Sequence, residues 1–239
     1  MHPVFIFIEV FFIIGITATF LANKNASAQT KKERWKKLGV HFLLVHLIVF
    51  CITETQKYFL FLLIIIILTG LYELVILLKQ KFQPILFYII AFIVYGICSA
   101  LFYYFNSTAN QGKIVFLFLL VFTFDGFSQI TGQLFGKRKL FPKVSPGKTV
   151  EGLIGGSLIT IITAYLTWGW VSELHYFIFI FSSAAIIIIS SITGDWLASY
   201  FKRKHSVKDY SDIIPGHGGF LDRFDSWIFT SAIIALIEM

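Results

Sequence analysis

Charged residues are scarce in this chain of 239 residues, where they make up 14% of the sequence, against about 25% in a typical soluble domain. Hydrophobic residues reach 57%, and the mean hydropathy is +0.80. So few charged residues cannot form the polar surface of a soluble enzyme. So apolar a composition also excludes a disordered chain. Cysteine is also scarce: Cys51 and Cys98 both lie in apolar runs, which excludes a disulfide scaffold. A polytopic membrane protein remains.

The apolar residues gather in eight runs. Because the bilayer core offers no water to backbone groups, each run is expected to form a helix. A β-barrel would need alternating polar and apolar residues, and the run 62–68 does not alternate. The expected fold is therefore all-α, a polytopic helical membrane protein with about eight transmembrane helices, and a ninth is left open. The runs cover residues 3–22, 38–53, 58–78, 84–105, 113–132, 152–171, 175–197 and 224–238.

Positive charge is divided unevenly between the loops. With eight spans, eighteen of the twenty Lys and Arg residues fall in four loops on one side, and only Lys57 and Lys113 fall on the other. The positive-inside rule places the basic side in the cytoplasm and both termini outside. Because this charge lies in short loops between apolar runs, membrane lipids are the expected partner and nucleic acid is not. The basic loops are 23–37, 79–83, 133–151 and 198–223.

The first apolar run admits a second interpretation. Ala26-Ser27-Ala28 follows the run and resembles a signal-peptidase site. However, no Lys or Arg precedes the run, and the basic residues that crowd just after it oppose translocation of that end. We therefore expect an uncleaved first span.

A few charged residues interrupt the apolar runs, where each costs about 2.5–3.5 kcal/mol at a helix centre. Asp125 shares one helix face with Ser128, Gln129 and Gly132, because their spacing is i, i+3, i+4 and i+7. The other faces of this run are apolar. A polar stripe that contains a carboxylate predicts a functional site, and a helix-packing seam is the alternative.

Two other acidic residues lie towards the basic side of their runs. Asp195 shares a face with Ser199 and Lys202, and this stripe leads from the membrane to the last basic loop. It predicts a site, with an aspartate solvated at a helix end as the alternative. Glu73 lies about two turns before Lys79, and a local polar contact or a position facing the cytoplasm is expected for it.

Two basic loops combine phosphate-binding residue types with glycine turns. The 145–152 loop is no P-loop, since G-x-x-x-x-G-K-[ST] is absent, and alone it is typical of a loop that touches lipid headgroups. The 199–225 stretch adds His217 and a pair of carboxylates, Asp222 and Asp225. Glycines let the backbone approach an anion, carboxylates hold a hard cation, and Lys and Arg bind phosphate. This combination fits phosphoryl or nucleotidyl transfer at the cytoplasmic face.

The 199–225 stretch resembles the C-terminal signature of the phosphatidate cytidylyltransferase (CDP-diacylglycerol synthase) family. The 145–152 stretch is similar to the family motif S-P-x-K-[ST]-x-E-G, and Gly194-Asp195 occupies the family's G-D position. The resemblance divides a single integral membrane domain, 1–239, into an N-terminal helix bundle, 1–112, and a catalytic half, 113–239. The signature positions that fit are Ser199, Phe201, Lys202, Arg203, Lys208, Asp209, Ser211, Ile214, Pro215, His217, Gly218, Gly219, Phe220, Asp222, Arg223, Phe224 and Asp225.

The resemblance implies that CMP is transferred from CTP to phosphatidic acid, giving CDP-diacylglycerol and pyrophosphate. It implies Mg²⁺, leaves a second, monovalent cation open, and implies a homodimer in a bacterial inner membrane with its active site facing the cytoplasm. The implied catalytic residues are Asp195, Asp222, Lys202 and His217. The implied substrate-binding residues are Lys148, Lys202, Arg203, Lys208, Gly218, Gly219, Arg223 and Ser199. The implied metal ligands are Asp195 and Asp222, with Asp125 and Asp225 as outer ligands.

Two other functions stay open at this point. The same site could serve a different lipid phosphate, such as an isoprenoid or ether-lipid phosphate, because any apolar span can contact the lipid chains. The chain could instead be a lipid transporter or scaffold without catalysis. A transporter usually carries its interrupted helices in two related halves, whereas the polar residues here are concentrated in the second half.

The division of basic residues gives a testable topology. In a chain whose two native cysteines are replaced by Ala, Lys143→Cys should resist a membrane-impermeant thiol reagent applied to intact cells. Lys57→Cys, on the opposite side of the membrane, should react. Ready labelling at position 143 in intact cells would contradict the assignment.

Overall fold

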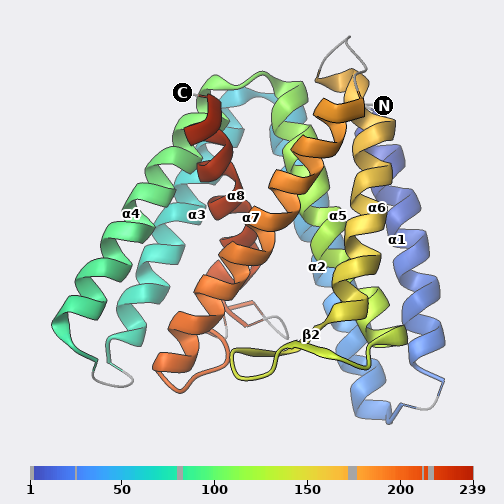
Figure 1. Ribbon diagram of the computed structural model, residues 1–239, viewed down its shortest axis with the longest axis horizontal. Coiled ribbons are helices and arrows are strands. Elements are labelled where there is room, and N and C mark those ends of the chain that lie inside the picture. Colours follow the sequence, from blue (N-terminus) through green and yellow to red (C-terminus); the bar gives the residue numbers. More distant parts are fainter. Residues whose placement is uncertain are drawn as a thin grey trace.

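The computed structural model describes residues 3–24, 26–79, 83–171, 177–211, 213–214 and 218–238. Within these residues the chain forms long helices and one small hairpin (Figure 1). The helices are α1 (Pro3–Ala22), α2 (Ala28–Glu54), α3 (Gln56–Leu77), α4 (Ile85–Thr108), α5 (Gln111–Phe135), α6 (Val150–Thr167), α7 (Phe177–Lys204) and α8 (Leu221–Glu238). A 3₁₀ turn, η1 (Trp168–Trp170), follows α6, and the strands are β1 (Lys139–Phe141) and β2 (Ser145–Thr149).

The predicted all-α membrane fold is confirmed. In the described part of the chain, seven helices, α1 to α7, are long and apolar enough to cross a membrane. The eighth, α8, has 18 residues, four of which carry charge. It buries Phe224 and Trp227 inside the bundle, where Figure 1 shows it between α4 and α7. Two of its charged residues contact other helices, Asp222 through Lys202 of α7 and Glu238 through Lys113 of α5.

Several helices are longer than the apolar runs predicted, and in α2 and α7 the added turns are basic. The run 38–53 belongs to α2, which begins at Ala28 because the Ser27 hydroxyl accepts a hydrogen bond from the Thr30 amide at 3.3 Å. At 27 residues α2 is about 40 Å long, so its basic first turns extend beyond the hydrocarbon. The run 175–197 belongs to α7, whose last turn contains three basic residues that favour a helix C-terminus.

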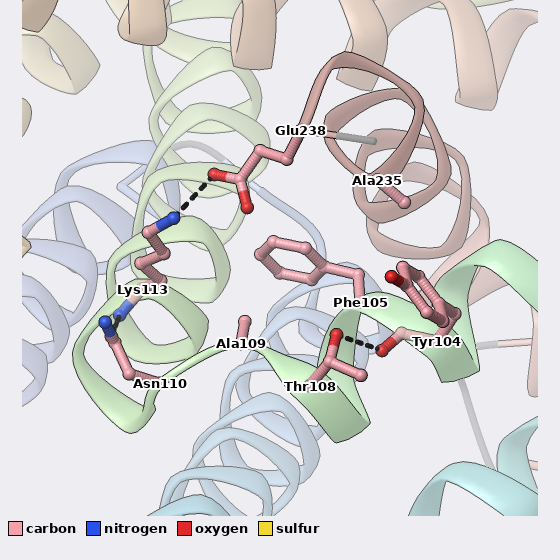
Figure 2. A pocket seen from close by; sticks show the side chains of 8 residues that line it. All are labelled: Tyr104, Phe105, Thr108, Ala109, Asn110, Lys113, Ala235 and Glu238. Atoms are coloured by element: carbon pink, nitrogen blue, oxygen red, sulfur yellow. Dashed lines mark hydrogen bonds and ion pairs between the residues drawn. The ribbon is translucent and has the colours of Figure 1, made fainter.

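The two ends of the bundle hold different parts of the chain. Figure 1 shows both chain ends at one end of the bundle and the β1–β2 hairpin at the other. This agrees with the even number of crossings that the sequence predicted. At the end that holds the chain ends, the Lys113 ammonium lies 2.9 Å from the Glu238 carboxylate and ties α5 to the last turn of α8, beside a pocket of about 410 Å³ (Figure 2).

The hairpin was not predicted from the sequence. Its strands are antiparallel, with Lys139 opposite Thr149 and Phe141 opposite Ser145. It occupies part of the 133–151 loop and crosses the end of the bundle below α5 and α6, with its turn beside the end of α7 (Figure 1). A strand of three residues is too short to produce a readable alternation of polar and apolar side chains, so the pattern of the sequence could not reveal it.

Helices α5 and α6 pack against each other through glycine. A Cβ atom on Gly152 would lie 2.6 Å from the Ser128 carbonyl oxygen and 3.3 Å from the Gly132 Cα. On the next turn of α6, a Cβ on Gly156 would lie 3.0 Å from the Phe124 carbonyl oxygen. Small residues four apart allow helix backbones to approach closely in a membrane. This approach fixes the start of α6, and with it the end of the hairpin, against α5.

We expect Gly152→Ala to destabilise the protein, because the added methyl group meets backbone atoms of α5 that cannot rotate away. The cost should be about 1–3 kcal/mol, the usual range for overpacking, and it should lower the thermal unfolding midpoint in detergent, followed by tryptophan fluorescence. Gly96→Ala in α4 is the matched control, because nothing lies within 4 Å of its Cβ position. Equal midpoints for the two variants would contradict the close-packing account.

Candidate active site

A cavity of about 770 Å³ lies at the hairpin end of the bundle. Residues of α2, α5, α7, α8, the hairpin and the segment before α8 all line it. One part of its wall is polar and holds carboxylates and cations. Another part is apolar and consists of Leu44, Val45 and Ile48 from α2 with Phe118, Val121 and Phe122 from α5. The cavity can therefore contact a charged group and a hydrocarbon chain at once.

The polar stripe of α5 faces this cavity. Asp125, Ser128, Gln129 and Gly132 all line it, so the predicted sharing of one helix face is confirmed. Asp125 Oδ1 lies 3.4 Å from the Ser191 hydroxyl of α7, which donates to it. The alternative of a packing seam also describes part of the stripe, since Ser128 and Gly132 are the residues that α6 approaches.

The 145–152 motif fixes the hairpin to α6. The Thr149 hydroxyl accepts a hydrogen bond from the Gly152 amide at 3.0 Å and caps α6. The Glu151 carboxylate accepts hydrogen bonds from the Lys137 and Arg138 amides at 3.0 and 3.1 Å, and from Arg138 Nε at 3.0 Å. These contacts hold the base of the hairpin to the first turn of the helix. Lys148, between them, is thereby held at the cavity wall.

Lys148 reaches across the cavity to Asp195. Its Nζ lies 2.8 Å from Asp195 Oδ2, and each side chain is about a quarter exposed. Burial lowers the pKa of Lys148, but the carboxylates of Asp195 and Asp125 raise it by more, so that the net shift is upward. The amine is therefore charged at neutral pH. Since α7 continues past Asp195 to Lys204, the alternative of an aspartate at a helix end is wrong.

Asp222 lies in the first turn of α8 and is already well supplied with partners. Its Oδ1 forms an ion pair with Lys202, and both side chains are nearly buried. Its Oδ2 accepts hydrogen bonds from the Tyr210 and Gly219 amides, both at 2.9 Å. The Lys202 ammonium also lies 5.1 Å from the centre of the Tyr210 ring. Burial raises the pKa of Tyr210 well above its ordinary value, with Asp225 and Asp222 adding to the shift, so its phenol stays neutral.

The carboxylates of the cavity are compatible with a divalent cation. Among the described residues, no three His, Cys, Asp or Glu side chains stand together as a ready-made metal site. Mg²⁺ usually takes only one or two carboxylates, and fills its other positions with water and substrate phosphate. Asp125, Asp195 and Asp225 line the cavity, and Asp225 Oδ2 is buried with no hydrogen-bond partner in the described structure. These hard oxygen atoms fit such an ion.

The structure brings together most, but not all, of the residues implied by the signature. Lys148, Lys208, Gly218, Arg223 and the four aspartates line the cavity. Lys202, Arg203, Ser199 and Gly219 are not in its lining. His217 lies outside the described residues, so nothing is said of its position.

Three of the residues outside the lining contribute to the frame of the site. Arg203 donates to the Val144 carbonyl oxygen at 2.9 Å and to the Val207 carbonyl oxygen at 2.7 Å, which joins the end of α7 to the hairpin. Lys202 is engaged with Asp222. Gly219 leaves no room for a side chain, because a Cβ would lie 2.8 Å from Asp222 Oδ2. Their implied roles towards substrate stay predictions.

Sequence reasoning missed contributions from the N-terminal half. Lys37 and His41 of α2 line the cavity, and the His41 ring stacks on Phe122 with centroids 5.1 Å apart. The spacing of Lys37, His41, Leu44 and Ile48 is helical. The sequence would have indicated this shared face if the helix had been predicted to begin before residue 38. The local polar contact or cytoplasm-facing position expected for Glu73 of α3 is wrong, because its side chain is fully buried and accepts hydrogen bonds from the distant Phe220 and Leu221 amides. Its backbone partners leave no sequence signal.

Comparison with known proteins shows the family of this chain. The model of the cytidylyltransferase family matches residues 2–238. A Rickettsia typhi protein named phosphatidate cytidylyltransferase is 34% identical over 219 residues, covering 88% of this chain and 94% of the relative. A Rickettsia felis protein of that name is 31% identical over 225 residues, covering 91% and 97%. The chain therefore belongs to the cytidylyltransferase family, as the signature resemblance led us to expect.

A third relative is more similar over a shorter stretch. The Staphylococcus epidermidis protein, also named phosphatidate cytidylyltransferase, is 40% identical over 139 residues. The alignment covers 57% of this chain and 53% of the relative, so this chain matches about half the length of the staphylococcal protein.

The ion pair between Lys148 and Asp195 can be measured by a double-mutant cycle. Lys148→Gln and Asp195→Asn should each lower the unfolding midpoint, and the double variant should lose less than the sum of the two. We expect a coupling free energy of about 1 kcal/mol, since the pair is partly exposed. Pairing Lys143→Gln with Asp195→Asn is the matched control, because Lys143 is exposed in the turn of the same hairpin. Additive losses in both cycles would rule out the contact.

Proposed function

We propose that this protein is a phosphatidate cytidylyltransferase, which transfers CMP from CTP to phosphatidic acid and releases pyrophosphate. The observation that carries the proposal is the cavity, which combines signature carboxylates and cations with an apolar wall at one end of a membrane bundle. The polar wall suits the phosphates of a nucleotide and of a lipid, and the apolar wall suits the lipid chain. The match of the cytidylyltransferase family to residues 2–238 supports this chemistry, and the names of the Rickettsia relatives support the substrate pair.

In this mechanism the cations of the cavity bind phosphate. Lys148, Lys208 and Arg223 line the cavity and supply the charge-assisted hydrogen bonds that phosphate oxygen atoms accept. Gly218, with a φ of 81°, lets the backbone pass close to Asp209 and keeps this part of the wall free of a side chain. The apolar residues of α2 and α5 hold the lipid chain, so that the lipid phosphate meets the nucleotide at the polar wall.

The reaction itself needs positioning more than protein chemistry. An oxygen of the lipid phosphate attacks the α-phosphorus of CTP, a new P–O–P bond forms, and the bond to the β-phosphate breaks as pyrophosphate leaves. The attacking phosphate is already an anion, so the protein need not remove a proton from it. Catalysis is therefore orientation and neutralisation of charge. Asp195 and Asp225, with Asp125 nearby, would hold Mg²⁺, which would supply the positive charge that offsets charge building on the phosphates. Asp222, which the signature implied as a metal ligand, is engaged by Lys202 and two backbone amides, so we assign its place to Asp225.

The location of the reaction is part of the proposal. The hairpin end of the bundle carries the basic loops, and the positive-inside rule places that end in the cytoplasm. CTP would reach the cavity from there, and phosphatidic acid would reach it from the inner leaflet of a plasma membrane. Purified protein in detergent, supplied with labelled CTP, Mg²⁺ and phosphatidic acid, should produce lipid-soluble label. Label with an isoprenoid phosphate but none with phosphatidic acid would reassign the substrate.

Asp195→Asn should reduce turnover by about 100-fold or more, a rise of about 2.7 kcal/mol in the barrier. The amide keeps the size of the side chain but loses the charge that balances Lys148 and that would hold the cation. Chelation of divalent ions by EDTA should abolish wild-type turnover, and added Mg²⁺ should restore it. Glu54→Gln, exposed at the C-terminal end of α2 and away from the hairpin, is the control and should keep wild-type activity. More than about a tenth of wild-type activity in Asp195→Asn at saturating Mg²⁺ would overturn the assignment.

A further inference from the structure

We propose that Glu73 of α3 is a positioning residue for the active site, which holds the start of α8 in the geometry that substrate binding requires. Glu73 lies outside the signature stretches, in the half of the chain that resembled the family only as a membrane bundle. The inference rests on the proposed function, because the site that Glu73 positions is the nucleotide site described above.

The carboxylate of Glu73 makes its contacts with one short segment. Its Oε1 accepts a hydrogen bond from the Phe220 amide at 2.7 Å, and its Oε2 accepts one from the Leu221 amide at 2.6 Å. The Ser211 hydroxyl donates a third hydrogen bond to Oε1. Glu73 has no solvent exposure. One buried side chain therefore satisfies two backbone groups at the beginning of α8 and one hydroxyl from the preceding loop.

An anion suits this place for physical reasons. The first amides of a helix have no partner within the helix, and the helix dipole gives them partial positive charge. Charge-assisted hydrogen bonds from such amides to a carboxylate are stronger than neutral ones. Leu221 begins α8, so Glu73 occupies the N-terminal end of this helix from a neighbouring helix. A glutamine there would turn an N–H group towards a backbone N–H group, and one hydrogen bond would be lost.

Glu73 and Asp222 hold the segment before α8 from two sides. Asp222 binds Lys202 and the amides of Tyr210 and Gly219, while Glu73 binds the next two amides. A Cβ on Gly219 would lie 2.8 Å from both carboxylates. The chain therefore passes between two carboxylates, and neither can move without moving it.

This clamp bears directly on the residues of the cavity. Arg223 and Asp225 follow Leu221 by two and four residues, and both line the cavity. The direction in which their side chains leave α8 depends on where the first turn of the helix begins. Weakening the Glu73 contacts should therefore change how well the site binds CTP, in addition to any effect on folding.

The experiment compares Glu73→Gln with wild type and with Glu9→Gln. Glu9 is the matched control, because it is a membrane-helix glutamate whose side chain is about half exposed and contacts His46 on the other side of the bundle. Glu73→Gln should raise the KM for CTP by about tenfold, the scale of one lost hydrogen bond to a charged group. It should also speed hydrogen–deuterium exchange in peptides that contain the Phe220 and Leu221 amides, while peptides from α4 exchange as in wild type. Glu9→Gln should change neither quantity.

The possible results separate the alternatives. A purely structural role for Glu73 would lower the unfolding midpoint and the fraction of active enzyme but leave the KM for CTP unchanged, and that result would overturn the proposal. Unchanged exchange at Phe220 and Leu221 would overturn it as well. Ser211→Ala removes one of the three hydrogen bonds and keeps the charge, so it should raise the KM by about two- to fivefold. If Glu73→Gln does not fold, the KM of Ser211→Ala tests the proposal in its place, and an unchanged KM for CTP would overturn it. If wild type shows no turnover, the proposed function fails, while the exchange measurement still tests the clamp.

Discussion

Buried backbone that is not helical must find its hydrogen-bond partners within the protein, because no water reaches it to replace them. The segment before α8 is such backbone, and the site depends on it. Buried carboxylates accept its hydrogen bonds. Asp222 accepts those of the Tyr210 and Gly219 amides, and Glu73 accepts those of the Phe220 and Leu221 amides. The same residues that satisfy the backbone thus determine where the cations and carboxylates of the cavity lie.

The hairpin on the other side of the cavity follows a related rule. It is fixed to α6 through the Thr149 cap and the Glu151 carboxylate, and α6 is fixed to α5 by close glycine packing. Arg203 then joins the end of α7 to the hairpin through the Val144 carbonyl oxygen. Several residues of the family motifs therefore hold backbone in place, whereas Lys148 lines the cavity.

The sequence was sufficient for the helices, their order and the side on which charge gathers, because long apolar runs and loop charges are one-dimensional properties. It also led to the shared face of Asp125, Ser128 and Gln129, because helical spacing is fixed. It could not separate Lys208, which lines the cavity, from Lys202, which is buried against Asp222. Both are lysines of one signature, and only their neighbours in space differ. Glu73 was missed for the same reason, since its partners are backbone amides more than 140 positions away in the chain.

The polarity of α8 has a consequence for biosynthesis. The helix has 18 residues, with Asp222, Arg223 and Asp225 near its start and Glu238 at its end. A charged residue adds to the cost of inserting a helix, by up to about 2.5–3.5 kcal/mol at its centre. Glu73 of α3, Lys202 of α7 and Lys113 of α5, which contact the segment that begins α8 or α8 itself, all precede it in the chain. By the time α8 leaves the ribosome, helices that carry its partners have already been made. It can therefore enter the bilayer against a protein surface, and the order of synthesis spares its charges exposure to lipid.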